Sequence, residues 1–332
     1  MAMTRRVAIL GDGGWGTCLA VLLDAKGNRV TLWGAFPEYV AQVQQTRENL
    51  KFLPGVPIPN SIRLTADPSQ VWDDTEVVVI AIPSRFLRDG LKRFSSGPWK
   101  QALVVSVVKG IEPETLLRMS ELVRQLLPVE RLAILSGPSI SYEVARGIPT
   151  TVVSASERDG LAKEVQDLFT TDRFRVYTST DVVGVELGGA LKNVIAIACG
   201  AADGLGFGAN TKAALTTRGL VEMARLGVAL GAQAETFSGL SGLGDLITTC
   251  FSAHSRNRGV GEQLGKGIPL AEVTKGMEQV AERITTAKSA YSLSQRYNVQ
   301  MPITTAVYQV LYEGKSPKDT VQDLMLRDPK PE

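Results

Sequence analysis

The sequence RVAILGDGGWGTCLAVLL, residues 6–23, decides the fold because it joins a strand pattern to a helix pattern through a glycine-rich turn. The apolar run Arg6 to Leu10 predicts a short strand, and the leucine and alanine spacing after the turn predicts a helix. Between them, Gly11, Gly13 and Gly16 form the pattern G-x-G-x-x-G. Such glycines allow a tight turn, close approach of the backbone to a pyrophosphate, and tight packing of helix on strand. We therefore predict a dinucleotide site here and not a plain turn.

Strand and helix patterns alternate from this point to about Thr180. Apolar strand patterns cover residues 29–33, 77–82, 103–108 and 132–135, and two closing strands are predicted at 151–153 and 174–177. Helical patterns lie between them at residues 85–94, 114–127 and 158–169. This alternation predicts an α/β fold with a doubly wound, Rossmann-type parallel sheet. After Thr180 the pattern is helical with glycine-rich breaks, so we predict a dinucleotide-binding domain at residues 1–180 and an all-helical substrate and catalytic domain at 181–332.

The end of the second strand leaves the choice of nucleotide open. An acid at this point, about twenty residues after the glycines, binds the ribose 2′-hydroxyl of NAD, whereas a basic residue binds the 2′-phosphate of NADP. The chain has Gly34, Ala35 and Phe36 there, with Glu38 and Arg47 as distant candidates only. The proline-rich segment at residues 49–59 predicts an irregular connector.

Composition excludes several classes of protein. The 332 residues are 44% hydrophobic and 21% charged, which is enough to bury a full core in two domains. A net charge of +2 without long runs of one sign predicts no general attraction to nucleic acid. The apolar runs are shorter than the roughly 20 residues of a membrane span, and no cleavable signal opens the chain. Cys18, Cys199 and Cys250 are odd in number and widely spaced, which indicates reduced thiols in a cytoplasmic protein and no metal site.

The chain has one histidine, His254. A dehydrogenase that uses a histidine as its base would have to use this residue.

Lys192 stands in an apolar helical run and follows two glycines, Gly188 and Gly189, that lie one turn before it. Each glycine costs roughly 1 kcal/mol relative to alanine within a helix. One interpretation is a surface lysine whose glycines admit a neighbouring helix. The other, which we favour, is a partly buried lysine at the floor of a cleft, where loss of water favours the neutral amine that proton transfer needs.

Three further segments carry candidate site residues. Lys109 follows the strand ending at Val108, and ligands of such sheets bind at the carboxyl ends of the strands. Asp245 lies four residues before Thr249 on one helical face, where it either orients a lysine or caps a helix. Arg256 follows closely, and its planar guanidinium matches the oxygens of a phosphate.

The segments GDGGWGT, VVKG, SGPS, SGLGDLITTC and SRNR, together with residues 184–223, resemble the NAD(P)-dependent glycerol-3-phosphate dehydrogenases of bacterial type. The resemblance covers nearly the whole chain. It implies an oxidoreductase that interconverts sn-glycerol 3-phosphate and dihydroxyacetone phosphate with NAD or NADP and supplies glycerol 3-phosphate for phospholipid synthesis. The apolar faces of the helical domain predict a homodimer.

The resemblance also implies roles for single residues. Lys192 matches the proton acceptor and donor, with Lys109 and Asp245 as further catalytic residues. Substrate contacts are implied for Lys109, Gly137, Ser139, Lys192, Asp245, Ser255, Arg256 and Asn257. Nucleotide contacts are implied for Gly11, Gly13, Gly14, Trp15, Gly16, Lys109, Ser141, Arg256, Val280 and Glu282. The chain departs from the family pattern at Ala35, where a basic residue or histidine is frequent, at Ser141, where alanine is frequent, and at Arg283, where a glycine usually follows the glutamate.

Two other functions fit parts of the pattern. A related hydroxyacid dehydrogenase would bind a carboxylate and would not need the Ser-Arg-Asn cluster at residues 255–257. A catalytically silent nucleotide-binding or regulatory protein would keep its function when Lys192 is replaced by alanine. An enzyme would lose most of its turnover and keep nucleotide binding.

Overall fold

The computed structural model describes residues 4–273, 275 and 278–329, without the side chains of residues 278–283. The chain divides into two compact units. One unit holds the chain up to Lys109 together with Met119–Val182, and the other holds Gly110–Arg118 together with the chain from Val183 onward. The short segment Gly110–Arg118 therefore belongs to the second unit, although both of its flanks belong to the first.

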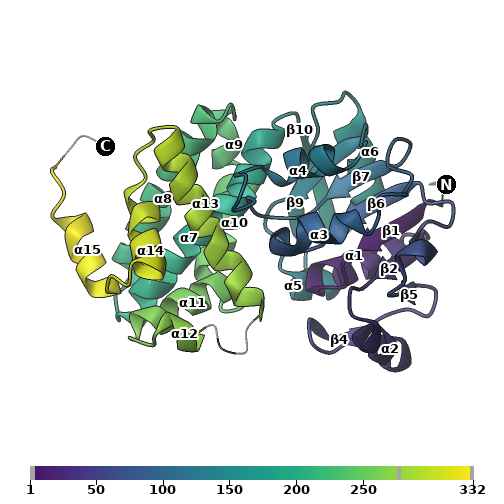
Figure 1. The fold of residues 1–332 in the computed structure, drawn as a ribbon, viewed down its shortest axis with the longest axis horizontal. Helices are drawn as coiled ribbons and strands as arrows, with labels where there is room; N and C mark the ends of the chain where they lie inside the picture. The colour runs from purple at the N-terminus through teal and green to yellow at the C-terminus, as the bar shows by residue number, and fades with distance from the viewer. Residues whose placement is uncertain (1–3, 274, 276–277, 330–332) are drawn as a thin grey trace. The chain divides into compact units, whose positions relative to one another are not determined.

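The first unit is built on an eight-stranded sheet with the order β10-β9-β8-β7-β6-β1-β2-β5 (Figure 1). Its strands are β1 (Arg6–Leu10), β2 (Arg29–Trp33), β5 (Arg63–Thr65), β6 (Val77–Ile80), β7 (Leu103–Ser106), β8 (Leu132–Ser136), β9 (Thr150–Ala155) and β10 (Phe174–Ser179). Every neighbouring pair is parallel except β8 and β9, which are antiparallel. Strands buried on both faces read as continuous apolar runs, as in Val77–Ile80. The predicted Rossmann-type sheet is therefore confirmed, with one antiparallel pair.

The described residues of this unit form six α-helices. They are α1 (Gly14–Ala25), α2 (Pro37–Thr46), α3 (Leu87–Lys92), α4 (Met119–Leu126), α5 (Ser141–Ala145) and α6 (Leu161–Phe169). The helix predicted at residues 114–127 begins only at Met119, because Leu116 has a φ of 62° and Ile111 pairs with Arg118. A left-handed residue cannot continue a right-handed helix, so the turn delays the start of α4.

The prediction of an irregular connector at residues 49–59 is wrong. The segment forms an antiparallel hairpin of β3 (Glu48–Asn49) and β4 (Leu53–Pro57). A two-stranded sheet tolerates prolines because its outer edge needs no N–H donors. Helix α2 and strand β5 were also not predicted.

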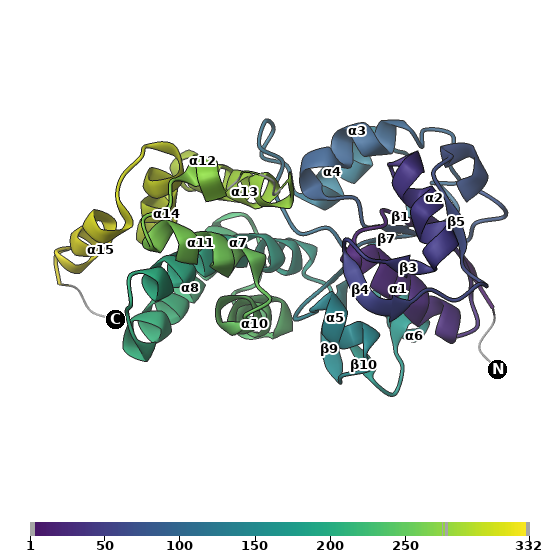
Figure 2. The same ribbon diagram turned by 90° about the horizontal axis from the view of Figure 1, so that it is seen from below.

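The second unit is helical (Figure 2). Its helices are α7 (Val182–Gly204), α8 (Ala209–Ala229), α9 (Ala234–Ser238), α10 (Asp245–Phe251), α11 (Arg256–Gly265), α12 (Leu270–Val273), α13 (Glu278–Arg296), α14 (Pro302–Tyr312) and α15 (Pro317–Met325). A π-helical turn, η3 (Leu240–Gly244), leads directly into α10. The all-helical character predicted from the sequence is confirmed.

Helix α7 forms the core of this unit. It has 23 residues and a mean hydropathy of 1.6 in its most apolar window, which would be long and apolar enough to cross a membrane. However, 89% of that window is buried inside the protein. The prediction that the apolar runs are too short to span a membrane applies to uninterrupted runs. Helix α7 reaches that length because polar residues stand among its apolar ones. Burial of this extent is typical of a core helix, which packs apolar residues around most of its circumference.

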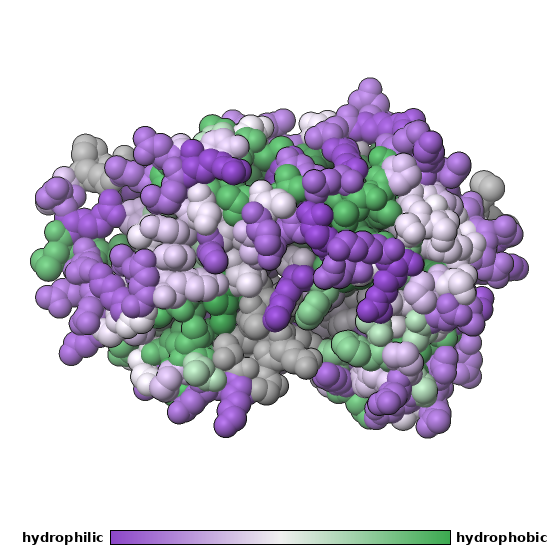
Figure 3. Space-filling model, viewed as in Figure 1, coloured by the Kyte–Doolittle hydropathy of each residue, from purple (hydrophilic) through white to green (hydrophobic). Residues whose placement is uncertain are grey.

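Helices α7 and α11 touch through their backbones. A Cβ added to Gly200 would lie 1.9 Å from the Arg258 carbonyl oxygen, and one added to Gly261 would lie 1.9 Å from the Ile197 carbonyl oxygen. The glycine-rich end of α7 therefore serves close helix packing, which fixes the start of α11 beside α7. On the face shown in Figure 3, hydrophilic side chains cover most of the surface and hydrophobic side chains form smaller patches.

Candidate functional site

The glycine-rich loop between β1 and α1 has the geometry of a phosphate cradle. Gly11 has a φ of 119°, and a Cβ on it would lie 2.6 Å from the Ala81 carbonyl oxygen. A Cβ on Gly16 would lie 1.9 Å from the Gly11 carbonyl oxygen, whereas one on Gly13 would meet nothing within 4 Å. Gly13 is the N-cap of α1 and makes no side-chain hydrogen bond, so the N–H groups of the first turn have no side-chain cap. A pyrophosphate fits such a site because it accepts from these donors and is favoured by the helix dipole.

The other predicted nucleotide residues of this unit lie around the same loop. A Cβ on Gly14 would lie 2.5 Å from the Phe52 carbonyl oxygen and 3.7 Å from the Ser141 hydroxyl oxygen. Ser141 begins α5, which packs against α1. The Trp15 ring packs near Phe174, with ring centroids 6.3 Å apart, so this ring anchors α1 on the sheet.

Lys109, Gly137 and Ser139 form one polar cluster beyond the carboxyl ends of β7 and β8. Lys109 Nζ donates to the Gly137 carbonyl oxygen at 2.9 Å and to Ser139 Oγ at 3.3 Å. Ser139 Oγ donates to the same carbonyl at 2.9 Å. Gly137 can adopt its φ of 117° at no steric cost because it lacks a Cβ. The sheet topology thus brings Lys109 to Gly137 and Ser139, as expected for three residues predicted to share a site.

In the helical unit, Lys192 on α7 donates a hydrogen bond to Asp245 on α10. The Lys192 residue is 7% exposed and Asp245 is 1% exposed. Asp245 does not cap a helix, because η3 runs into α10 through Gly244 in a helical conformation. Its carbonyl oxygen also accepts from Thr249 Oγ1 at 2.6 Å, one turn later. Burial penalises an isolated ammonium, whereas a neighbouring carboxylate stabilises it, so the pair keeps both groups out of bulk water.

Gly188 explains how the acid reaches the lysine. A Cβ on Gly188 would lie 2.3 Å from the Ser241 carbonyl oxygen. Gly188 lies one helical turn before Lys192, and Ser241 lies one turn before Asp245. The missing side chain therefore admits the backbone of η3, and the next turn of each element brings the two charges together. Lys192 is therefore buried, as the favoured sequence interpretation had it, whereas Gly188 admits a neighbouring element, as the other interpretation had it.

The residues Ser255, Arg256 and Asn257 open helix α11. Ser255 is its N-cap and accepts from the Arg258 backbone N–H at 3.3 Å. Asn257 is 5% exposed and donates from Nδ2 to Asn193 Oδ1 at 2.7 Å, which places it against the residue after Lys192. Asn257 Oδ1 is buried and has no hydrogen-bond partner among the described residues. Arg256 is exposed.

Two residues near this cluster were not assigned a role from the sequence. Asn193 orients Asn257, and only its position beside Lys192 could have indicated this. Asp203 accepts from Arg258 Nε at 2.6 Å and from Lys212 Nζ at 2.7 Å, so it ties α7 to α11 and α8. His254 is exposed in the turn between α10 and α11.

The three cysteines are buried and reduced. Burial raises the pKa of Cys18 to about 12. A hydrogen bond with Cys250 lowers the pKa of Cys199, and the same bond together with burial raises the pKa of Cys250. This thiol pair belongs to the packing of α7 against α10.

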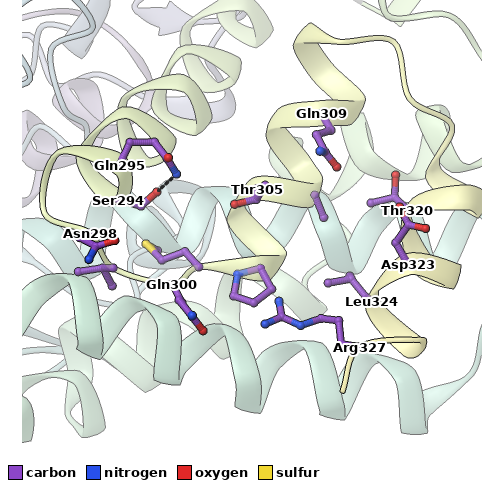
Figure 4. A pocket seen from close by; sticks show the side chains of 14 residues that line it. Ser294, Gln295, Asn298, Gln300, Thr305, Gln309, Thr320, Asp323, Leu324 and Arg327 are labelled. Atoms are coloured by element: carbon purple, nitrogen blue, oxygen red, sulfur yellow. Dashed lines mark hydrogen bonds between the residues drawn. The ribbon is translucent and has the colours of Figure 1, made fainter. Parts of the chain in front are cut away.

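Val280 and Glu282 lie within α13, but their side chains fall outside the described part of the structure. A hollow of about 400 Å³ lies elsewhere in the helical unit, among α13, α14 and α15 (Figure 4). Gln300 lines it from the turn between α13 and α14, and Arg327 lines it from the chain after α15. None of the described site residues lines this hollow, so we do not assign the chemistry to it.

Two family models match the chain. The model for the N-terminus of NAD-dependent glycerol-3-phosphate dehydrogenase matches residues 6–162, and the model for its C-terminus matches residues 181–322. Together they span both units described above.

Full-length relatives agree with this match. The glycerol-3-phosphate dehydrogenase [NAD(P)+] of Citrifermentans bemidjiense is 49% identical over 333 residues, covering 99% of both chains. The crystal structure of glycerol-3-phosphate dehydrogenase from Coxiella burnetii is 36% identical with a TM-score of 0.93, covering 98% of this chain and 99% of that one. The enzyme from Saccharomyces cerevisiae is 28% identical with a TM-score of 0.81, covering 98% of this chain and 100% of that one.

Proposed function

This chain belongs to the NAD-dependent glycerol-3-phosphate dehydrogenase family, and we propose that it interconverts sn-glycerol 3-phosphate and dihydroxyacetone phosphate with NAD or NADP. One observation carries the mechanism, namely the buried ion pair of Lys192 and Asp245. A lysine amine that is shielded from water and fixed by a carboxylate is suited to transfer a proton to or from a bound substrate.

The nucleotide would be held by the glycine-rich loop and the first turn of α1, with Gly14, Trp15 and Ser141 beside its phosphates. When bound, it supplies a hydride to C2 of the ketone or accepts one from C2 of the alcohol. The open space above Gly13 and the uncapped N–H groups of α1 support this assignment.

Lys192 moves the proton that accompanies the hydride. In ketone reduction, Lys192 Nζ donates a proton to the C2 oxygen, so that hydride and proton together add across the C2–O double bond. In alcohol oxidation, the neutral amine accepts that proton. Asp245 orients the amine and stabilises its charged form, while Thr249 fixes the turn that carries Asp245.

The phosphate of the substrate is proposed to bind at the start of α11. Arg256 would provide a bidentate, charge-assisted contact, and Asn257 would add its side chain from a buried position held by Asn193. Ser255, Lys109, Gly137 and Ser139 complete the proposed substrate set. Binding energy from a phosphate remote from C2 orients the reacting carbon. We also propose that the nucleotide contacts Lys109, Arg256, Val280 and Glu282.

We infer that residues 1–180 bind the nucleotide and that residues 181–332 supply Lys192 and the phosphate site. We further infer a cytoplasmic homodimer that reduces dihydroxyacetone phosphate and supplies glycerol 3-phosphate to phospholipid synthesis.

An assay of dihydroxyacetone phosphate reduction tests the proposal. The purified protein should oxidise NADH or NADPH with this substrate and not with 2-oxo acids of similar size. Lys192→Ala should lower kcat by about 10²- to 10⁴-fold, the usual contribution of a general acid, and keep nucleotide affinity. Activity on 2-oxo acids alone would favour a hydroxyacid dehydrogenase, and unchanged function of Lys192→Ala would favour a protein that only binds nucleotide.

A further inference from the structure

The end of β2 in this protein lacks the side chain that normally selects the nucleotide. In Rossmann folds an acid at this point binds the adenosine ribose, and a basic residue accommodates a 2′-phosphate. Here Trp33 ends β2 and Gly34 and Ala35 follow, so the strand itself supplies neither charge.

A carboxylate from another segment lies at this point. A Cβ added to Gly34 would lie 2.2 Å from Asp12 Oδ2 and 2.5 Å from Asp12 Cγ. The Asp12 carboxylate therefore occupies the space in which a side chain at position 34 would begin. Asp12 comes from the glycine-rich loop, between Gly11 and Gly13.

The loop around Asp12 is held by the hairpin of β3 and β4. Asn49 Nδ2 donates to the Asp12 carbonyl oxygen at 2.7 Å and to Thr17 Oγ1 at 2.7 Å. Tyr39 donates from its hydroxyl to Asn49 Oδ1 at 2.6 Å. A network of this kind fixes the backbone of Asp12, so the place of its carboxylate is set before any ligand binds.

The Asp12 carboxylate is not fully paired within the described residues. Asp12 Oδ2 is buried and has no hydrogen-bond partner within the part of the chain that the structure describes. The small cavity beside it has a volume of about 10 Å³, which is near the size of one water molecule. The residue as a whole remains partly exposed. Burial raises the pKa of Asp12 to about 6, and its own backbone N–H and the charge of Lys51 lower it in part.

We propose that Asp12 takes over the role of the missing acid at the end of β2, so that it accepts a hydrogen bond from the adenosine ribose 2′-hydroxyl and makes this protein prefer NAD(H) to NADP(H). The inference rests on the proposed function and deepens it by naming the nucleotide. A 2′-phosphate carries negative charge and offers no donor at neutral pH, so it would be repelled where a hydroxyl is bound.

Nucleotide binding to the purified protein tests the inference without any substrate. We expect NADH to bind at least about tenfold more tightly than NADPH, measured by isothermal titration calorimetry, since one charge-assisted hydrogen bond is at stake. Asp12→Asn keeps the shape and removes the charge, and it should reduce this ratio by about tenfold. Asp159→Asn is the matched control, because it makes the same substitution at an exposed residue between β9 and α6 and should leave the ratio unchanged.

A charge relocation provides a second measurement. In Asp12→Ala/Gly34→Asp, the acid moves to the end of β2 and enters the space that Asp12 vacates. The Val40 Cγ2 methyl group, 2.7 Å from a Cβ at position 34, must also shift. The preference for NADH should return in this variant, with thermal unfolding confirming that it is folded. An equal or tighter affinity of the wild-type protein for NADPH, or an unchanged ratio in Asp12→Asn, would overturn the inference while leaving the dehydrogenase proposal intact. Absence of binding by both nucleotides would overturn both.

Discussion

Lys192 Nζ donates a hydrogen bond to Asp245 although 53 residues separate the two in sequence. Both side chains are buried, and they come from two helices, α7 and α10, whose approach depends on Gly188. The candidate chemistry and the stability of the helical unit therefore meet in one ion pair. Experiments can therefore measure the contribution of this pair to the unfolding free energy separately from its contribution to turnover.

Replacing one partner of this pair should destabilise the protein more than replacing both. Lys192→Met leaves a buried carboxylate and Asp245→Leu leaves a buried ammonium, and each should cost roughly 3–5 kcal/mol. The double variant removes both charges and should regain most of that stability, whereas turnover should remain lost in all three variants. Urea unfolding and kcat for dihydroxyacetone phosphate give the two readouts. Lys163→Met, in an exposed pair with Asp167, is the control and should change little.

That result would separate a catalytic pair from a structural one. A double variant that recovers turnover together with stability would show that the ion pair only holds the two helices, and it would contradict the role given to Lys192.

Gly188→Ala should separate α7 from η3. The added Cβ would lie 2.3 Å from the Ser241 carbonyl oxygen, a backbone atom that cannot swing aside. We expect a loss of about 1–3 kcal/mol in unfolding free energy, as for overpacking, and a lower kcat because Asp245 shifts with η3. Gly259→Ala is the matched control on α11, where a Cβ meets nothing within 4 Å. It should be neutral or stabilising, since alanine favours a helix over glycine. A wild-type kcat in Gly188→Ala would show that the position of Asp245 does not depend on the close contact between Gly188 and the Ser241 carbonyl oxygen.

Arg256→Ala should weaken recognition of the substrate phosphate. Loss of a charge-assisted bidentate contact should lower kcat/KM for dihydroxyacetone phosphate by about 10- to 100-fold at saturating NADH. The rate with unphosphorylated dihydroxyacetone should change little, because that substrate never used the contact. Arg258→Ala is the comparison, since Arg258 pairs with Asp203 and should affect stability in preference to phosphate selectivity. Equal losses on both substrates in Arg256→Ala would argue against a phosphate role.

The stability of the nucleotide-free protein should carry the signature of Asp12. Its pKa is raised from 3.8 to about 6 by burial, so the unfolded chain loses this proton at lower pH than the folded protein. This group's contribution is therefore fully present below about pH 4 and is lost as pH rises to about 6, by at most about 3 kcal/mol. Lys51 and the Tyr39 hydroxyl are the nearby titratable groups, and Lys51 limits the effect.

Asp12→Asn removes this pH-dependent term. The melting temperature of the variant minus that of the wild type should therefore increase between about pH 4.5 and pH 7.5. Thermal unfolding in nucleotide-free buffer measures the difference, and a constant or decreasing difference would contradict the burial of an ionised Asp12.

The sequence alone determined the fold class and the nature of the nucleotide loop. β1 and β2 have the predicted bounds. β1 is an apolar run buried along nearly its whole length, and β2 buries Val30, Leu32 and Trp33. The turn before α1 was also readable, because Gly11 and Gly16 stand where a Cβ would collide with backbone. Such requirements are local, so the order of residues is enough to reveal them.

Only the tertiary structure decided which residues meet. Asp245 as the partner of Lys192, Asn193 as the partner of Asn257, and the Asp12 carboxylate at Gly34 all depend on crossings between distant segments. A glycine in the sequence states that a side chain is absent, but not which backbone fills the space. The hairpin at residues 48–57 likewise escaped prediction, because its strands are stabilised by pairing and by Asn49 contacts more than by an apolar pattern of their own.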